Sequence, residues 1–170
     1  MCATRLPRNG HLLDVGTASG AVLKSAHEVL PGWSLHAFDL HDVRRGEILS
    51  LPGVVSFSSG DYRSLPEGPF DLIVLWHALE HSSRPLELLG LLRTRLRPGG
   101  RMVIQVPDVR RTPFDLPVLD HCSHFQSAGL LTLVEEAGYI RVLDGREWSH
   151  NCLTLLLENC GRSASCVEDS

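Results

Sequence analysis

The sequence predicts an α/β protein with a Rossmann-like, doubly wound, mostly parallel seven-stranded sheet and a C-terminal antiparallel hairpin. Short apolar runs alternate with segments of helical spacing, which is the pattern of parallel strands joined by helices. A glycine-rich turn joins the first run to the first helical segment. The run Phe70–Trp76 is apolar on nearly consecutive residues, as expected of a strand covered by helices on both faces. We therefore place it at the centre of the sheet.

The amino-terminal half is expected to alternate strand and helix. An apolar run begins at His11 and breaks at Gly16, and helical spacing follows as far as Leu30. Pro31 ends that helix because proline lacks the backbone N–H that a helix interior needs. The next elements are a strand over Ser34–Asp39, a short helix within His41–Leu49 and a strand over Val54–Phe57.

The second half continues the alternation and ends in a hairpin. The helix after Phe70–Trp76 carries Pro85 in its first turn and is closed by Pro98-Gly99-Gly100. After a strand over Arg101–Val106, Ser127 is expected to cap a last helix. The final elements are two strands, Ile140–Leu143 and Leu153–Leu157, which pair as an antiparallel hairpin.

Length and composition limit the classes of protein that fit. With 170 residues, 43% hydrophobic and 21% charged, the chain is expected to form one domain over 1–160 with a frayed tail over 161–170. No apolar stretch reaches the ~20 residues of a membrane span and no secretory signal is visible, so we expect a cytoplasmic protein. Five cysteines without a C-x-x-C pair argue against a disulfide framework and a zinc ribbon. A net charge of -4 gives no general attraction to nucleic acid.

The turn Gly16-Thr17-Ala18-Ser19-Gly20 suits a ligand, because backbone N–H groups at a helix start are not obstructed by bulky side chains. No Lys-Ser or Lys-Thr follows Gly20 at the position that a phosphate-binding P-loop requires, which excludes that motif. Ala18 and Ala21 stand where a dinucleotide fingerprint has glycine, so a nicotinamide oxidoreductase is a weaker alternative. Asp14, inside the preceding strand, would repel a pyrophosphate and favour a cation, or would only brace the turn.

The pattern acid-x-Gly-x-Ala-x-Gly from Asp14 to Gly20 resembles the first motif of class I S-adenosylmethionine (SAM) dependent methyltransferases, with Ala18 in place of the middle glycine. Later blocks that resemble the family are Phe70–His81, Leu96-Arg97-Pro98-Gly99-Gly100, and His124-Phe125 with Leu130–Tyr139. The branch it resembles most contains ubiquinone-biosynthesis O-methyltransferases. The resemblance implies SAM as cofactor, S-adenosylhomocysteine as product, and in-line methyl transfer to an oxygen or nitrogen of a small-molecule or glycan-like acceptor.

The resemblance also implies a set of cofactor-binding residues. Asp39 would accept hydrogen bonds from both ribose hydroxyls, and Leu40 would pack on the adenine. Asp61 would accept from the adenine amino group, although taken alone it would be interpreted as the start of a turn. Trp76 would wall the methionine end of the pocket, or lie in the core. The complete set is Asp14, Gly16, Thr17, Ala18, Gly20, Asp39, Leu40, Asp61, Tyr62 and Trp76.

Histidines are the candidate general bases, because imidazole titrates near neutral pH. The candidates are His77, His81 and His124, with His121 of the same late loop considered beside them. Together with Glu80 and His121 they are also similar to the metal ligands of small-RNA 2′-O-methyltransferases, with His77 in place of the first glutamate. A hydrogen-bonded brace is the preferred interpretation, so no metal site is predicted.

The sequence departs from the family in one further feature, the helices that cover the bound cofactor. Family members usually carry helices before the first strand that close over SAM, whereas the first strand here begins at His11. Either the domain is a minimal or truncated one, or the loop 107–117, a partner chain or a second copy of the chain covers that side. The alternative function is a SAM-binding domain that is non-catalytic or depends on a partner.

Overall fold

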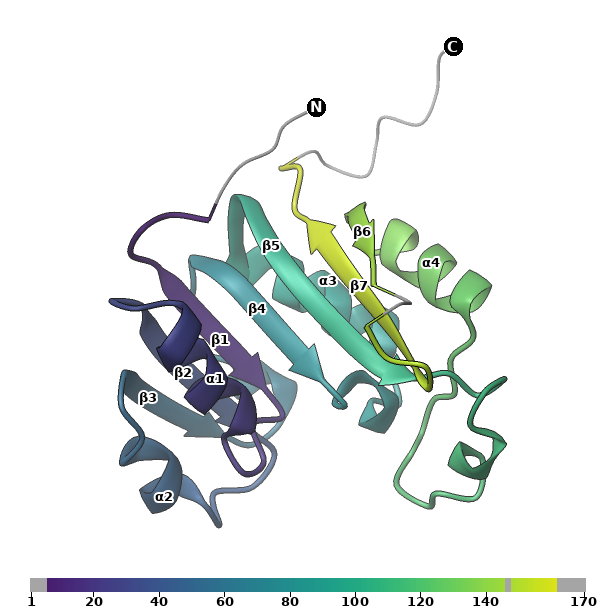
Figure 1. Cartoon of the computed structure of the whole chain (residues 1–170), viewed down its shortest axis with the longest axis horizontal. Helices are drawn as coiled ribbons and strands as arrows, with labels where there is room; N and C mark the ends of the chain where they lie inside the picture. Colours follow the sequence, from purple (N-terminus) through teal and green to yellow (C-terminus); the bar gives the residue numbers. More distant parts are fainter. Residues whose placement is uncertain (1–5, 146–147, 162–170) are drawn as a thin grey trace.

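The computed structural model describes residues 6–145 and 148–161. The strands are β1 (His11–Val15), β2 (Ser34–Asp39), β3 (Val54–Ser59), β4 (Phe70–Trp76), β5 (Leu96–Pro107), β6 (Ile140–Asp144) and β7 (Cys152–Glu158). They form one sheet in the order β3-β2-β1-β4-β5-β7-β6 (Figure 1). Strands β1 to β5 pair in parallel, and β7 is antiparallel to its neighbours β5 and β6. The predicted fold class is confirmed.

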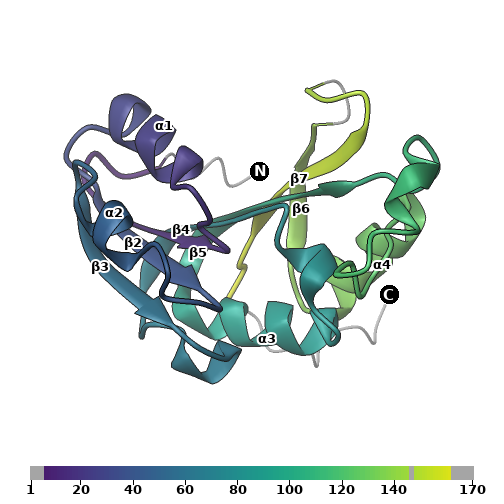
Figure 2. The ribbon, with the colours of Figure 1, turned by 90° about the horizontal axis from the view of Figure 1, so that it is seen from below.

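Helices cover both faces of this sheet. They are α1 (Ala21–Val29), α2 (Arg45–Leu49), α3 (Pro85–Arg95) and α4 (Ser127–Glu136), with 3-10 turns η1 (Tyr62–Ser64), η2 (Leu79–His81) and η3 (Pro113–Asp115). In β4, Leu72 and Val74 pack with α1 and α2, whereas Ile73 and Leu75 pack with α3 and α4. Figure 2 shows α1 and α3 on opposite sides of the sheet. These two cores are the reason that β4 is apolar on consecutive residues.

Two helix boundaries differ from those predicted. Helix α3 ends at Arg95, before the Pro98-Gly99-Gly100 segment expected to close it, and Leu96 begins β5 and pairs with Phe70. The backbone N–H and C=O groups at Leu96 can form hydrogen bonds either in a longer helix or by pairing with β4. Local sequence therefore does not decide where α3 ends, and the tertiary contact with β4 does. Gln126, not Ser127, precedes α4, and no side chain caps that helix. The predicted cap at Ser127 is therefore wrong by one position.

The closing strands pair with each other as predicted, but the second one joins the rest of the sheet. β7 pairs with β5 from Arg101↔Glu158 to Pro107↔Cys152, and β6 lies outside it at the edge. Leu153, Leu155 and Leu157 of β7 are at most 3% exposed, whereas Ile140 of β6 is 53% exposed. The more apolar strand takes the inner position because burial there removes more apolar surface from water.

Most of the tail predicted over 161–170 lies outside the described residues, as do residues 146–147. No helix in the described ranges has the length and apolar character that spanning a bilayer requires.

Candidate functional site

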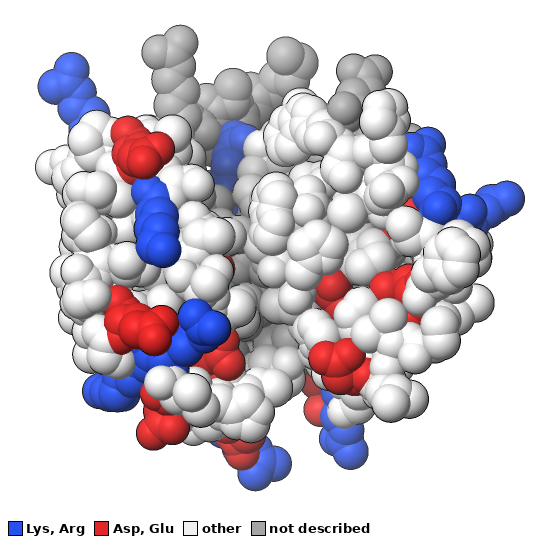
Figure 3. Space-filling view, turned by 60° about the horizontal axis from the view of Figure 1, so that its bottom comes forward, with Lys and Arg blue, Asp and Glu red and all other residues white. Residues whose placement is uncertain are grey.

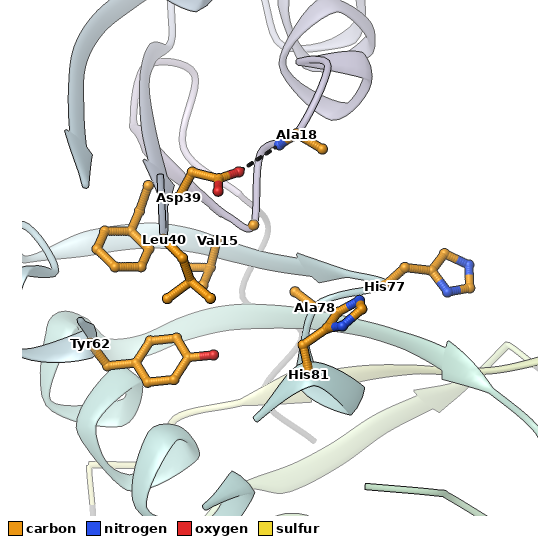
Figure 4. Close-up of a pocket in the computed structure, with 10 residues that line it drawn as sticks. Val15, Ala18, Asp39, Leu40, Tyr62, His77, Ala78 and His81 are labelled. Atoms are coloured by element: carbon orange, nitrogen blue, oxygen red, sulfur yellow. Dashed lines mark hydrogen bonds between the residues drawn. The ribbon is translucent and has the colours of Figure 1, made fainter. Parts of the chain in front are cut away.

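A pocket opens at the carboxyl ends of β1, β2 and β4, next to the point where the strand order reverses. Parallel sheets bind ligands at such a point because the loops on either side diverge and leave a crevice. The pocket has a volume of about 200 Å³, and Figure 3 shows this edge of the molecule hollowed along its middle. Its lining residues are Val15, Gly16, Ala18, Phe38, Asp39, Leu40, Tyr62, His77, Ala78 and His81 (Figure 4).

The turn after β1 is held against the end of β2. The N–H groups of Gly16 and Thr17 both donate to the Phe38 carbonyl oxygen, at 2.8 and 3.2 Å. Gly16 has φ +79°, and a Cβ on it would lie 2.8 Å from the Ala78 Cβ, so glycine is required there. Ala18 has φ 43°, a left-handed conformation that costs an alanine about 1 kcal/mol. The position that departs from the family motif is therefore one that favours glycine.

Asp39 closes this turn from the end of β2. Its Oδ2 accepts a hydrogen bond from the Ala18 N–H at 3.0 Å, and its Oδ1 accepts from the His41 N–H at 3.3 Å. Each carboxylate oxygen can accept a second hydrogen bond, so a ligand with two adjacent hydroxyls can still be bound. Leu40 follows and is 45% exposed, and Figure 4 shows it facing Tyr62 across the pocket. The space between these two side chains suits a flat ring.

Asp14 lies buried beneath the turn. It is 1% exposed, and its Oδ2 accepts a hydrogen bond from the Thr17 hydroxyl at 2.7 Å. Its Oδ1 has no hydrogen-bond partner among the described residues. Burial raises the pKa of Asp14 from 3.8 to about 7; the Thr17 hydrogen bond opposes this rise and the charge of Asp39 adds to it. A carboxyl group with a spare buried oxygen is suited to a cationic ligand.

The predicted residues divide into those that line the pocket and those that support it. The lining ones are Gly16, Ala18, Asp39, Leu40, Tyr62, His77 and His81. Gly20 supports the turn as the residue before α1, with φ +74° and a virtual Cβ 2.6 Å from the Leu51 Cδ1. Thr17 lines an adjacent hollow together with Ala18 and Asp39. Prediction missed the apolar lining by Val15 and Phe38, near the ends of β1 and β2, and by Ala78, just before η2.

Asp61 and Trp76 do not line the pocket. The Asp61 carboxylate accepts from the Arg63 N–H at 2.8 Å and caps η1, which is the turn role that its local sequence indicates. Trp76 is the last residue of β4, and its side chain lies in an apolar groove between α1 and β5. Strand alternation places it on the same face as Val74, away from the pocket. The expectation that Trp76 walls the methionine end is therefore corrected.

A cluster of histidines and two buried carboxylates lies at the end of β4. His77 Nδ1 is 3.1 Å from Glu80 Oε1, and this hydrogen bond raises the pKa of His77 against the effect of its partial burial. The loop before α4 brings His121 and His124 to Asp115, with Nδ1 to carboxylate distances of 2.7 and 3.0 Å. Nothing in the local sequence indicated Asp115, because its role depends on the folding of that loop.

The predicted bases therefore differ in their access to the pocket. His81 lies beside Ala78 at the end opposite Leu40 and Tyr62, whereas the His77 ring points away from them (Figure 4). The ring centroids of His81 and His121 are 4.8 Å apart, which joins the cluster to the pocket. His124 is not among the lining residues.

Comparisons with known proteins agree with this geometry. A family model described as a methyltransferase domain matches residues 1–142. Acetylserotonin O-methyltransferase of Rattus norvegicus is 38% identical over 114 residues, which cover 61% of this chain and 26% of that protein. The Mus musculus enzyme is 32% identical over 104 residues, which cover 55% of this chain and 27% of that protein. The chain thus spans about a quarter of the length of these curated relatives.

Solved structures share the fold. Human N-acetylserotonin methyltransferase in complex with SAM has a TM-score of 0.70 at 20% identity, covering 87% of this chain and 47% of that one. Another similar structure is a chain of the complex between the Haloferax volcanii Trm112 methyltransferase activator and a methyltransferase. It has a TM-score of 0.77 at 15% identity, covering 91% of this chain and 83% of that one. Because the family model matches most of the sequence and the fold agrees, the chain belongs to the methyltransferase domain family of class I, SAM-dependent enzymes.

Proposed function

We propose that this protein transfers the methyl group of SAM to an oxygen atom of a small-molecule acceptor. The observation that carries the proposal is the pocket between Asp39, Leu40 and Tyr62 at one end and His81 at the other. One end of it offers groups suited to a nucleoside, and the other offers imidazole. Such a division of chemistry within one pocket supports a transfer reaction with two bound substrates.

The residues present fit the parts of SAM. Asp39 would accept hydrogen bonds from the ribose hydroxyls, and Leu40 and Tyr62 would flank the adenine. Gly16 lines the pocket and has no side chain, so its backbone is open to the methionine part. The unpartnered Oδ1 of Asp14 would balance the positive charge of the amino group. The ribose hydroxyls, the adenine ring and the amino group of the family's cofactor therefore each have a complementary group here.

The acceptor end supports methylation of oxygen. When bound, SAM supplies an electrophilic methyl on a cationic sulfur: the carbon–oxygen bond forms as the carbon–sulfur bond breaks, and sulfur keeps the electron pair. A hydroxyl acceptor must also lose its proton, which a cluster of imidazoles can assist. His81 lines the pocket and is placed for this role, His77 also lines it, and the ring of His124 lies 6.5 Å from that of His121. The curated relatives, named as O-methyltransferases, support the same choice.

The face around the pocket is consistent with a small acceptor. Over the part of it that the structure describes, Lys and Arg side chains are scattered among Asp and Glu instead of forming one basic surface (Figure 3). Nucleic acids are bound through many phosphate contacts by clustered basic side chains. The charge distribution therefore favours a small molecule over a nucleic acid.

Calorimetric titration with S-adenosylhomocysteine, in the presence of EDTA, tests the cofactor site. We expect the unmodified protein to bind, and Asp39→Ala to bind at least tenfold more weakly without unfolding, because it loses the acceptors for the ribose. Asp42→Asn, an exposed carboxylate three positions away, is the matched control and should bind normally. Absence of binding to the unmodified protein would contradict the proposal. Transfer of labelled methyl groups to a panel of phenols and amines then tests the preference for oxygen.

A second candidate function is a SAM-binding domain that needs a covering chain for turnover. The observation that favours it is an apolar groove beside α1, lined by Leu72, Val74, Val103 and Trp76, where Trp76 is 42% exposed. Exposed apolar grooves are typical of surfaces that another segment covers. The Haloferax volcanii relative in complex with a methyltransferase activator supports this reading. Binding of S-adenosylhomocysteine with methyl transfer only after addition of a second chain would favour it.

A further inference from the structure

We propose that Glu80, His81 and His121 bind a divalent transition-metal ion at the end of the pocket. Each offers one ligand atom, and the three atoms lie within 4.8 Å of one another. Glu80 and His81 belong to η2 at the end of β4, whereas His121 comes from the loop before α4. The site therefore links two segments that are 40 residues apart in the sequence.

Glu80 provides the observation that points to a ligand. The residue is 1% exposed, and its Oε1 is occupied by His77 Nδ1 at 3.1 Å. Its Oε2 is buried and has no hydrogen-bond partner within the described part of the chain. A buried carboxylate oxygen without a donor is unfavourable, because it has lost its water and gained nothing in return. A cation at this oxygen would supply the missing interaction.

The two histidines are already oriented for metal binding. His121 Nδ1 is 2.7 Å from Asp115 Oδ1, and His81 Nδ1 is 3.0 Å from the Asp120 carbonyl oxygen. A carbonyl or carboxylate beside Nδ1 holds the proton on that nitrogen and leaves the Nε2 lone pair available. Imidazole ligands of metal ions commonly donate their other N–H to a carboxylate or carbonyl in this way. The surroundings thus select the tautomer that a metal needs.

The ligand set indicates the class of ion. Two imidazoles and one carboxylate suit first-row ions such as Zn²⁺, Mn²⁺ or Co²⁺, whereas Ca²⁺ and Mg²⁺ prefer oxygen ligands. Nitrogen and oxygen ligands about 2.1 Å from one ion are at most about 4.2 Å apart. The present spread of 4.8 Å therefore requires the side chains to close by roughly 1 Å. Rotations of partly exposed histidine side chains can supply such a movement.

The consequence for the reaction rests on the proposed function. Three protein ligands leave coordination positions free, and His81 lines the pocket, so the ion would lie at the acceptor end. An acceptor hydroxyl bound to the ion would have its pKa lowered, and its proton would leave to water as the oxygen becomes the nucleophile. The metal would thus replace a histidine as the means of activating the acceptor.

Titration of the metal-free full chain with Co²⁺ tests the site, because this ion reports its ligands in the visible absorption spectrum. We expect one equivalent to bind and the spectrum to lack thiolate-to-cobalt charge transfer. Glu80→Gln and His121→Gln should each weaken binding at least tenfold. The matched controls are His11→Gln, which alters the separate His11–His36 pair, and Cys122→Ser, which removes the thiol next to His121. Both controls should bind as the unmodified protein does.

Several results would overturn the assignment: no binding, a thiolate band, or undiminished affinity in the folded Glu80→Gln or His121→Gln protein. If circular dichroism shows that Glu80→Gln does not fold, His121→Gln and the spectrum of the unmodified protein decide the question. Binding of S-adenosylhomocysteine in EDTA is measured separately. If the unmodified protein binds S-adenosylhomocysteine but not Co²⁺, the metal site is rejected and the proposed function stands. If it binds Co²⁺ but not S-adenosylhomocysteine, only the proposed function is rejected.

Discussion

Replacement of Asp14 by asparagine should remove a pH dependence of stability that the buried carboxyl causes. Its pKa is raised from 3.8 to about 7, so folding favours the protonated form. The stabilisation by this proton is complete below pH 3.8 and is lost as the pH rises through 7. Between pH 5 and pH 8 the two pKa values correspond to a loss of about 2 to 3 kcal/mol. Asparagine carries no charge and can still accept the Thr17 hydrogen bond.

Urea denaturation at pH 5, 6, 7 and 8, in EDTA, measures this effect. The free energy of unfolding of Asp14→Asn, minus that of the unmodified protein, should increase by about 2 to 3 kcal/mol over this range. Asp42→Asn is the control. Because the Asp42 side chain is exposed, the free energy of unfolding of this variant, minus that of the unmodified protein, should stay constant over the pH range. If the free energies of unfolding of Asp14→Asn and of the unmodified protein change with pH in parallel, burial does not raise the pKa of Asp14 as argued.

Three further predictions concern the turn and the core. S-adenosylhomocysteine should bind more tightly at pH 8 than at pH 6, because its ammonium group requires ionised Asp14; calorimetry with equal affinities would contradict this. Gly16→Ala should lower stability by about 1 to 3 kcal/mol, since its Cβ would lie 2.8 Å from that of Ala78; an unchanged Tm would argue against a required glycine. Tyr139→Phe should lower the free energy of unfolding by about 1 kcal/mol, because it removes the buried hydrogen bond to the Leu89 carbonyl oxygen. A urea midpoint equal to that of the unmodified protein would disprove this.

The alternation of strands and helices was predictable because it depends on local patterns. Hydrophobic spacing and the positions of proline and glycine act within a few residues, so the run over β4 and the turn after β1 follow directly from the sequence. The placement of Asp39 at the pocket was predictable for a related reason. Parallel strands end at the same edge of a sheet, so an acid at the end of β2 lies near the turn after β1.

Other features depend on choices that local patterns leave open. An apolar run does not reveal which face each residue takes, and the prediction for Trp76 was wrong for this reason. The end of α3 moved because Leu96 pairs with Phe70, a contact between residues 26 positions apart. Asp61 remained ambiguous because capping a turn and binding a ligand require the same carboxylate.

By itself, the sequence determined the fold class, the edge of the sheet that holds the pocket and the kind of cofactor that this edge suits. Only the tertiary structure decided how the histidines are grouped. Asp115 joins His121 to His124, and Glu80 lies beside them with a buried oxygen that has no partner in the described ranges. These contacts join residues from separate loops, and where a loop brings its side chains depends on the packing of the whole domain.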